Sequence, residues 1–314
     1  TTSENEGTWP LSAPLFSVVI PTYNRPRQLA ACLLGLAELE YPRGGYEVTV
    51  VDDGSARPPE GVVASFAGKM AVRLIIAEHG GPARARNAGA ARAGGRFLVF
   101  IDDDCLPAGN LLKRLEARFS ASPDCLVGGR TLNALPDNRY SEASQLLIQY
   151  LYSYYNILHG PARFFASNNL ALPAEKFHAI GGFDGSLVTS EDREFCDRWR
   201  YHGYATYYDP EVVVYHAHCL NLRTYWQQHF AYGRGAFHFH VVRARRARER
   251  IRIEPPSFYL RLLGHPLSRR GVGPNPPVIA LLTLSQIAYG VGFAWEALSR
   301  GKLKRLAAPI TMPE

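Results

Sequence analysis

Three consecutive aspartates, Asp102, Asp103 and Asp104, directly follow the apolar run 96–101 (RFLVFI). This run is rich in aromatic and branched residues and therefore predicts a buried strand. Three carboxylates at one strand end repel one another, and each raises the pKa of its neighbours. A divalent cation removes that cost, because Mg²⁺ and Mn²⁺ prefer oxygen ligands and Mg²⁺ fills its remaining positions with water and phosphate oxygens. We therefore expect a metal and phosphate site here, with a solvated acidic turn as the alternative.

The sequence up to this point alternates strand-like and helix-like segments. Strand-like runs cover residues 15–20, 46–51 and 72–76, and helix-like runs cover 27–39, 59–68 and 82–94. This alternation is typical of βαβ units and predicts an α/β fold with a mostly parallel sheet flanked by helices. Ligands bind such sheets beyond the carboxyl ends of the strands. Asn24, Asp53 and Asp103, which all follow strands, should therefore converge on one crevice.

Seven short motifs follow one another along the chain, and their order matters as much as their residues. They are VVIPTYNR (18–25), VDDGS (51–55), ARNAG (85–89), FIDDD (100–104), SNNLA (167–171), GGFD (181–184) and SEDREF (190–195). Each motif alone is weak evidence, but the ordered set resembles the family 2 glycosyltransferases, which have the nucleotide-sugar-binding GT-A fold. The resemblance covers roughly residues 15–235, about two thirds of the chain.

The resemblance implies a division of the chain into three parts. Residues 1–14 would form an N-terminal tail, 15–235 the GT-A catalytic domain, and 236–314 a helical C-terminal extension. Within the catalytic domain, about 15–128 would bind the nucleotide sugar and about 129–235 the acceptor.

The resemblance also implies which residues bind the donor. The expected nucleotide-sugar contacts are Pro21, Thr22, Tyr23, Asn24, Arg25, Asp53, Arg84, Arg86, Asn87, Asp102 and Asp103. For Arg84 and Arg86, solvated arginines at the start of a helix are an equally good interpretation. The expected metal ligands are Asp104 and His216, with His218 as the alternative. The two histidines end the apolar run 212–215 and lie on one face if the chain is extended, so a hydrogen-bonded structural role stays open.

Asp192 is the general base that the resemblance implies. It opens the helical segment 191–200, with Ser190 as the expected N-cap, and a helix N-terminus stabilises a charged carboxylate. Ordinary acidic charge at a helix start is the alternative. On the acceptor side, the expected residues are Asn168, Asn169, Glu191 and Trp199. The aromatic cluster 150–155 with His159 predicts stacking on a sugar ring, or else core packing.

These assignments predict a metal-dependent, inverting glycosyltransferase of the hexosyltransferase type. The donor would be a nucleoside diphosphate sugar, first a UDP-sugar, with GDP- and dTDP-sugars as alternatives, and the cofactor Mn²⁺ or Mg²⁺. The acceptor would be a saccharide or a lipid-linked molecule in the synthesis of a polysaccharide, glycolipid or other glycoconjugate. A sugar-1-phosphate nucleotidyltransferase is the alternative enzyme, although the turn after the first strand lacks that class's glycine-rich phosphate loop. A non-catalytic membrane- or polyanion-binding protein would leave the acidic strand ends unexplained.

The C-terminal part is basic and partly apolar. Residues 234–305 contain 14 Lys or Arg and 3 Glu, against 21 basic and 25 acidic residues in the rest of the chain. The basic run 243–252 predicts a helix, and the apolar stretch 278–298 is close to the lower limit for spanning a bilayer. Together they predict contact with an anionic membrane surface. Packing on the chain's own domain or in a homodimer is the alternative, and nucleic acid is not an expected partner because no binding module is recognisable.

The remaining composition indicates a cytoplasmic protein, peripheral on the inner face of the cell membrane if the C-terminal part binds lipid. The five cysteines are scattered without CxxC spacing, which predicts buried free thiols rather than disulfides or a zinc site. Residues 1–14 are polar, so no signal peptide is expected there.

Overall fold

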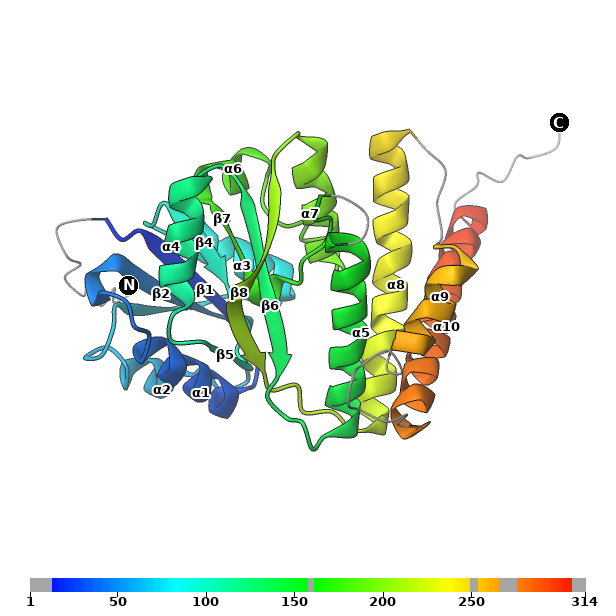
Figure 1. Cartoon of the computed structure of the whole chain (residues 1–314), viewed down its shortest axis with the longest axis horizontal. Helices are drawn as coiled ribbons and strands as arrows, with labels where there is room; N and C mark the ends of the chain where they lie inside the picture. Colours follow the sequence, from blue (N-terminus) through cyan, green and yellow to red (C-terminus); the bar gives the residue numbers. More distant parts are fainter. Residues whose placement is uncertain (1–12, 158–160, 249–253, 266–275, 307–314) are drawn as a thin grey trace.

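The computed structural model describes residues 13–157, 161–248, 254–265 and 276–306. Its centre is an eight-stranded sheet in the order β3-β2-β1-β4-β7-β6-β8-β5 (Figure 1). The strands are β1 Phe16–Thr22, β2 Tyr46–Asp52, β3 Val72–Ile76, β4 Phe97–Phe100, β5 Cys105–Pro107, β6 Leu126–Asn133, β7 Leu170–Pro173 and β8 Thr206–His216. Strand β1 pairs in parallel with β2 and β4, β2 with β3, and β6 with β8, whereas β7 and β5 pair antiparallel to their neighbours. The predicted mostly parallel sheet is therefore confirmed.

Helices cover both faces of the sheet, which explains why β1, β2 and β4 are buried at every position. One face packs on α1 Pro26–Ala37, α2 Glu60–Ala64 and α4 Leu111–Ala121, around a core that includes Leu33 and Phe119. The other face packs on α3 Pro82–Ala90, α6 Ala174–Ala179 and α7 Glu191–Tyr201, around Phe177 and Phe195. Helices α2 and α3 are shorter than the predicted 59–68 and 82–94. Two 3₁₀ turns, η1 Arg43–Gly45 and η2 Ser167–Asn169, precede β2 and β7.

Four further helices stand beside the sheet as a second layer (Figure 1). They are α5 Arg139–Asn156, α8 Leu222–Ala247, α9 Pro256–Gly264 and α10 Pro276–Leu306. Helix α8 runs through position 235, where the catalytic domain was predicted to end, and the division into a catalytic domain and an extension stays a prediction. The predicted basic helix 243–252 is the end of α8, with Arg248 as its left-handed C-cap, and residues 249–253 lie outside the described ones.

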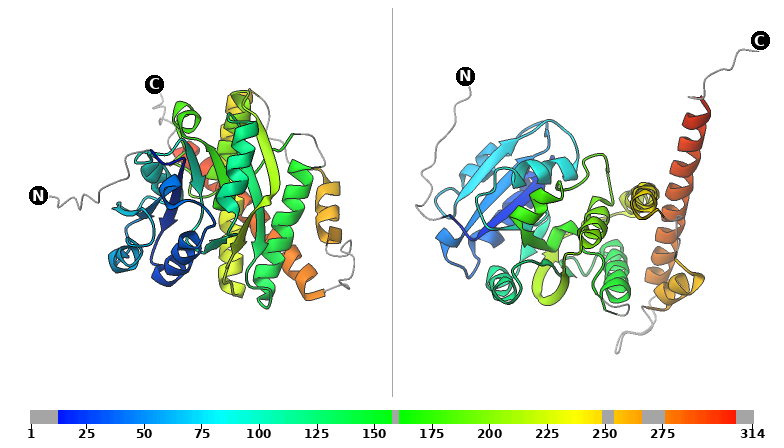
Figure 2. Two further views of the ribbon diagram at one scale, coloured as in Figure 1. Left: turned by 60° about the vertical axis from the view of Figure 1, so that its left-hand side comes forward. Right: turned by 90° about the horizontal axis from the view of Figure 1, so that it is seen from above.

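The apolar stretch 278–298 forms most of α10, which packs on its own chain. Val278, Leu281 and Leu282 are buried against Leu146 of α5 and Tyr225 of α8. One described helix, Pro276–Ser299 of α10, is long and apolar enough to cross a membrane, and 33% of its most apolar 18-residue stretch is buried inside the protein. Seen from above, the C-terminal end of α10 extends beyond the rest of the molecule (Figure 2).

The cysteines agree with the prediction except at one position. Cys32, Cys105, Cys125 and Cys196 are buried free thiols, but Cys219, in the turn between β8 and α8, is exposed.

Helices α8 and α10 cross at two glycines. A Cβ on Gly233 would lie 1.9 Å from the carbonyl oxygen of Tyr289, and a Cβ on Gly292 would lie 2.0 Å from that of Phe230. Backbone cannot yield as a flexible side chain can, so only glycine permits this approach.

We expect Gly292→Ala to lower the free energy of unfolding by about 1–3 kcal/mol, because the added methyl group forces α8 and α10 apart. Gly290→Ala is the matched control: it lies on the same helix, its Cβ would meet nothing within 4 Å, and alanine favours a helix over glycine by about 1 kcal/mol. Urea unfolding of both variants measures the difference. Equal stability of the two variants would show that α10 does not pack on α8 in this way.

Candidate active site

The carboxyl ends of β1, β2 and β4 meet at one edge of the sheet, as expected for parallel neighbours. Thr22 at the end of β1 donates a hydrogen bond from Oγ1 to Oδ2 of Asp103 at 2.7 Å. Asp53, after β2, accepts hydrogen bonds from the backbone amides of Gly80 and Gly81 at 2.8 and 3.0 Å. Asp53 thereby fixes the turn that leads into α3, and all three acidic and hydroxyl side chains are buried.

These strand ends line one cavity of about 1140 Å³. Most of the predicted site residues also line it: Pro21, Thr22, Tyr23, Arg25, Asp53, Arg86, Asp102, Asp103, Asp104, Asn168, Glu191, Asp192, His216 and His218. The cavity therefore joins the expected donor, metal and base residues, which are distant in the sequence.

The acidic triplet is partly compensated by side chains of this chain. Arg25 Nη1 lies 3.2 Å from Oδ1 of Asp103 and 3.0 Å from Oδ2 of Asp104, and Arg86 Nη2 lies 2.5 Å from Oδ1 of Asp102. Because Asp103 is buried and Asp102 and Asp104 are half-buried, the solvated acidic turn considered from the sequence is wrong.

The environments of two of these carboxyl groups push their pKa values apart. Burial raises the pKa of Asp103 to about 6, although the hydrogen bond from Thr22 and the charge of Arg25 lower it. Burial also raises the pKa of Asp104, but the hydrogen bond and charge of His216, together with Arg25, outweigh it and hold that pKa at about 2. Asp104 is therefore ionised at any ordinary pH.

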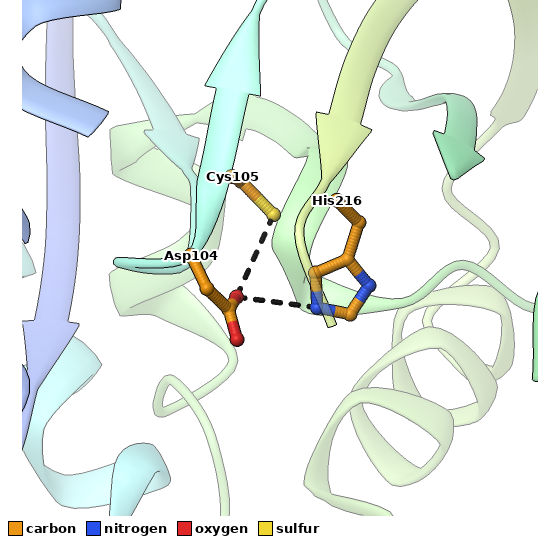
Figure 3. Close-up of side chains that lie close together, drawn as sticks. All are labelled: Asp104, Cys105 and His216. Atoms are coloured by element: carbon orange, nitrogen blue, oxygen red, sulfur yellow. Dashed lines mark hydrogen bonds and ion pairs between the residues drawn. The ribbon is translucent and has the colours of Figure 1, made fainter. Parts of the chain in front are cut away.

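Asp104, Cys105 and His216 form a cluster that could hold a metal ion (Figure 3). Their ligand atoms lie within 4.8 Å of one another, and His216 Nε2 is 3.2 Å from Oδ1 of Asp104. A carboxylate oxygen and an imidazole nitrogen fit Mn²⁺ or Mg²⁺. The Cys105 thiol fits poorly, because it is a soft ligand and burial raises its pKa well above the ordinary value.

His218 lies beside the cluster rather than in it. Its ring stacks on that of His216 with centroids 4.6 Å apart, and burial together with the charge of His216 lowers the pKa of His218 to about 3. His218 is therefore neutral near pH 7. A neutral imidazole can bind a metal ion, so His218 remains the alternative ligand.

The predicted base lies at the start of α7, across the cavity from the strand ends. Oδ1 of Asp192 accepts a hydrogen bond from the backbone amide of Arg193 at 2.7 Å. Burial and then the neighbouring Glu191 carboxylate raise the pKa of Asp192 to about 7. Ser190 is the N-cap residue of α7, as predicted, but with φ 69° it is left-handed and its side chain makes no capping hydrogen bond.

Arg86 connects the two ends of the site. Its Nη1 donates to Oε1 of Glu191 at 2.9 Å while its Nη2 contacts Asp102. The guanidinium is buried, and a single charge thus ties the acidic strand end to the helix that carries Asp192. Arg84 is exposed instead and donates to the Gly185 carbonyl at 3.2 Å, as the solvated-arginine alternative predicts.

Four other predicted residues do not line the cavity, and their side chains form hydrogen bonds with backbone groups instead. Asn24 accepts a hydrogen bond from the amide of Ala56, and Asn87 exchanges two hydrogen bonds with the backbone of Phe183. Asn169 donates to the carbonyls of Arg130 and Val212. Trp199 is fully buried and donates from Nε1 to the Ala205 carbonyl at 2.9 Å, so the predicted acceptor contact of Trp199 is wrong.

The aromatic cluster divides between the two interpretations. Tyr155 lines the cavity, whereas Tyr150 and Tyr154 pack edge to face against Phe258. His159 lies outside the described residues.

Sequence reasoning missed the part of the cavity wall that comes from α7 and from the second helical layer. Arg193, Gln228, Tyr232, Tyr289 and Phe293 line it, from α7, α8 and α10. The uncharged pattern of 278–295 indicated a buried or membrane-contacting helix but not a wall of the site.

Comparisons with known proteins agree with this geometry. Residues 17–185 match the family model "Glycosyl transferase family 2". Glycosyltransferase AglE of Haloferax volcanii is 28% identical over 210 residues, covering 65% of this chain and 67% of that protein. Validoxylamine A glucosyltransferase of Streptomyces hygroscopicus subsp. jinggangensis is 30% identical over 220 residues, covering 60% of this chain and 52% of that protein. The chain thus spans about half the length of that second relative.

Solved structures share the fold. The mannosyltransferase PcManGT from Pyrobaculum calidifontis, in complex with GDP-Man and Mn²⁺, superposes with a TM-score of 0.60 at 20% identity over 97% of this chain and 85% of that chain. TarS 1–349 of S. aureus, in complex with UDP, gives 0.54 at 17% identity over 91% of each chain. The sheet and its helices thus have the GT-A architecture, and the family match covers more than half of the sequence. The chain belongs to glycosyl transferase family 2.

Proposed function

We propose that this chain transfers a hexose from a nucleoside diphosphate sugar to an acceptor hydroxyl, with inversion at the anomeric carbon. One observation carries the proposal: Asp104 and His216, the strand-end carboxylates and Asp192 line the same cavity. Similar structures bind GDP-Man with Mn²⁺ and UDP, which supports a nucleotide sugar as donor.

The residues at the carboxyl ends of β1, β2 and β4 support a nucleoside diphosphate as the ligand of this part of the cavity. Tyr23 stacks on His79 with ring centroids 4.5 Å apart and is exposed toward the cavity, beside the turn that Asp53 fixes. These residues would hold the nucleoside, and Arg25 would contact the diphosphate. Asp104 and His216 would bind Mn²⁺ or Mg²⁺, and the bound ion would supply positive charge against the charge on the departing diphosphate.

The chemistry needs a proton acceptor on the other side of the sugar. The acceptor oxygen forms a bond to the anomeric carbon while the bond from that carbon to the β-phosphate oxygen breaks, and the electron pair leaves with the nucleoside diphosphate. Asp192 takes the hydroxyl proton, for which a carboxyl pKa of about 7 is well matched. A single displacement of this kind inverts the configuration.

We place the reaction in glycoconjugate synthesis on the cytoplasmic side of a membrane. Arg245 and Arg248 at the end of α8 are exposed and could face anionic lipid, whereas Arg246 pairs with Asp197 of α7 at 2.8 Å.

Asp104→Ala should abolish the Mn²⁺ dependence of nucleoside diphosphate binding, because it removes the ionised carboxylate of the metal cluster. Asp53→Ala is the comparison: it should weaken binding by releasing the turn at Gly80 and Gly81 but leave the Mn²⁺ dependence in place. Calorimetric titrations of UDP and GDP, with Mn²⁺ and with EDTA, measure both effects. An Asp104→Ala variant whose affinity still rises on adding Mn²⁺ would refute the metal assignment.

Asp192→Asn keeps the shape of the side chain and removes the proton acceptor. Turnover, measured as nucleoside diphosphate release, should fall by about 10²- to 10⁴-fold while donor affinity is retained. The control is Asp124→Asn, an exposed aspartate outside the cavity, which should leave turnover unchanged.

The pH profile checks the same assignment. Below its pKa of about 7, Asp192 is protonated and cannot accept a proton, so kcat/KM should rise as the pH increases through about 7 and then level off. A flat profile between about pH 5 and 8, or near-normal turnover of Asp192→Asn, would rule out Asp192 as the base.

A further inference from the structure

One part of the cavity wall comes from α5, α9 and α10, and we call it the apolar arm. Hydrocarbon and aromatic side chains of these helices line it: Leu147, Leu151, Tyr155, Phe258, Leu263 and Phe293. Polar side chains of the same helices, Gln145 and Gln286 among them, line the cavity as well. A soluble saccharide offers little apolar surface to such walls. A hydrocarbon chain, by contrast, gains free energy from each methylene group that it buries there.

Ile287 of α10 both lines the cavity and is 52% exposed, so we take it as the place where the apolar arm meets the surface. Val291, Trp295 and Leu298 follow on the same helical face, and each is also exposed. This apolar stripe, from Ile287 to Leu298, leads toward the C-terminal end of α10, which extends beyond the rest of the molecule (Figure 2). An exposed tryptophan among aliphatic side chains is typical of a helix that lies in a membrane interface.

A cation lies where the polar and apolar parts of the cavity meet. Arg193, next to Asp192 on α7, lines the cavity, and its guanidinium lies over the rings of Phe239 and Tyr155, at 4.5 and 5.9 Å from their centroids. Within the described ranges, no carboxylate forms an ion pair with Arg193, whose side chain donates a hydrogen bond to the Tyr289 hydroxyl. The nearby Glu254 accepts hydrogen bonds from Tyr155 and Tyr154 at 2.7 and 3.2 Å.

We propose that the acceptor is an anionic lipid that this chain glycosylates while the lipid remains in the membrane. The hydroxyl-bearing end reaches Asp192, a phosphate group pairs with Arg193, and the hydrocarbon chain fills the apolar arm and leaves along the stripe on α10. Arginine suits this position because its planar guanidinium binds phosphate while it stacks on aromatic rings. The inference rests on the proposed function and specifies its acceptor class.

Short amphiphiles test the inference on the intact chain. Decyl phosphate, butyl phosphate and decyl maltoside, each below its critical micelle concentration, are titrated calorimetrically. Decyl phosphate should bind at least about tenfold more tightly than butyl phosphate, because its additional methylene groups are buried in the arm. It should also bind more tightly than decyl maltoside, which has the same chain but no negative charge.

Two variants separate the contribution of the ligand's hydrocarbon chain from that of its negative charge. Gly290 lines the cavity and has open space around its Cβ position, so Gly290→Leu should fill the arm without disturbing α10 and remove the preference for the longer chain. Gly290→Ala is the matched control and should retain most of that preference. Arg193→Gln should remove the preference for phosphate over maltoside but keep the preference for the decyl chain.

Equal binding of decyl and butyl phosphate, or decyl phosphate binding that Gly290→Leu does not weaken, would overturn the inference. Mn²⁺-dependent UDP or GDP binding is measured on every variant. If this binding persists but the preference for decyl over butyl phosphate is absent, the proposal of a lipid acceptor is wrong and the proposed transferase function stands. If Mn²⁺-dependent binding is absent from the unmodified chain as well, the proposed function itself fails.

Discussion

The site depends on one buried guanidinium. Arg86 contacts Asp102 at the end of β4 and Glu191 at the start of α7, and so fixes the distance between the acidic strand end and Asp192. Removing it would leave the carboxylates of Asp102 and Glu191 without their cation, and breaking a buried ion pair of this kind typically costs about 3–5 kcal/mol. Because α7 also packs through Phe195 on the sheet, the position of the base is set by the charge bridge and by the core together.

Carboxyl groups on opposite sides of the cavity have different pKa values because their surroundings differ. Asp104 accepts a hydrogen bond from His216 and pairs with Arg25, so its low pKa keeps it ionised and suited to a cation. No described side chain forms an ion pair or hydrogen bond with Asp192. Burial and the neighbouring Glu191 therefore raise its pKa to about 7, which suits proton transfer near neutral pH. Environments that push the pKa values of two carboxyl groups apart distinguish an electrostatic role from an acid–base role.

Local patterns predicted the local structure well. The alternating runs before Asp102 indicated the parallel half of the sheet, because strand and helix periods and the acidic strand ends are short-range features of the sequence. Residue type within a motif did not reveal which way a side chain points, so Asn169 and Trp199 were assigned to the acceptor although they are buried in the fold. The apolar arm was not predictable, since it exists only where α5, α9 and α10 come together, and no residue in it has a distinctive spacing.

Release of nucleoside diphosphate from a panel of UDP-, GDP- and dTDP-sugars tests the central claim most directly. The purified chain is incubated with each donor in Mn²⁺, in Mg²⁺ and in EDTA, and the released diphosphate is quantified against a sample without protein. Even without an acceptor, slow transfer to water should cleave one nucleotide class in the presence of a divalent cation and none in EDTA. If no donor is cleaved or bound under any of these conditions, or if cleavage is unchanged in EDTA, the cavity is not the metal-dependent transferase site described above.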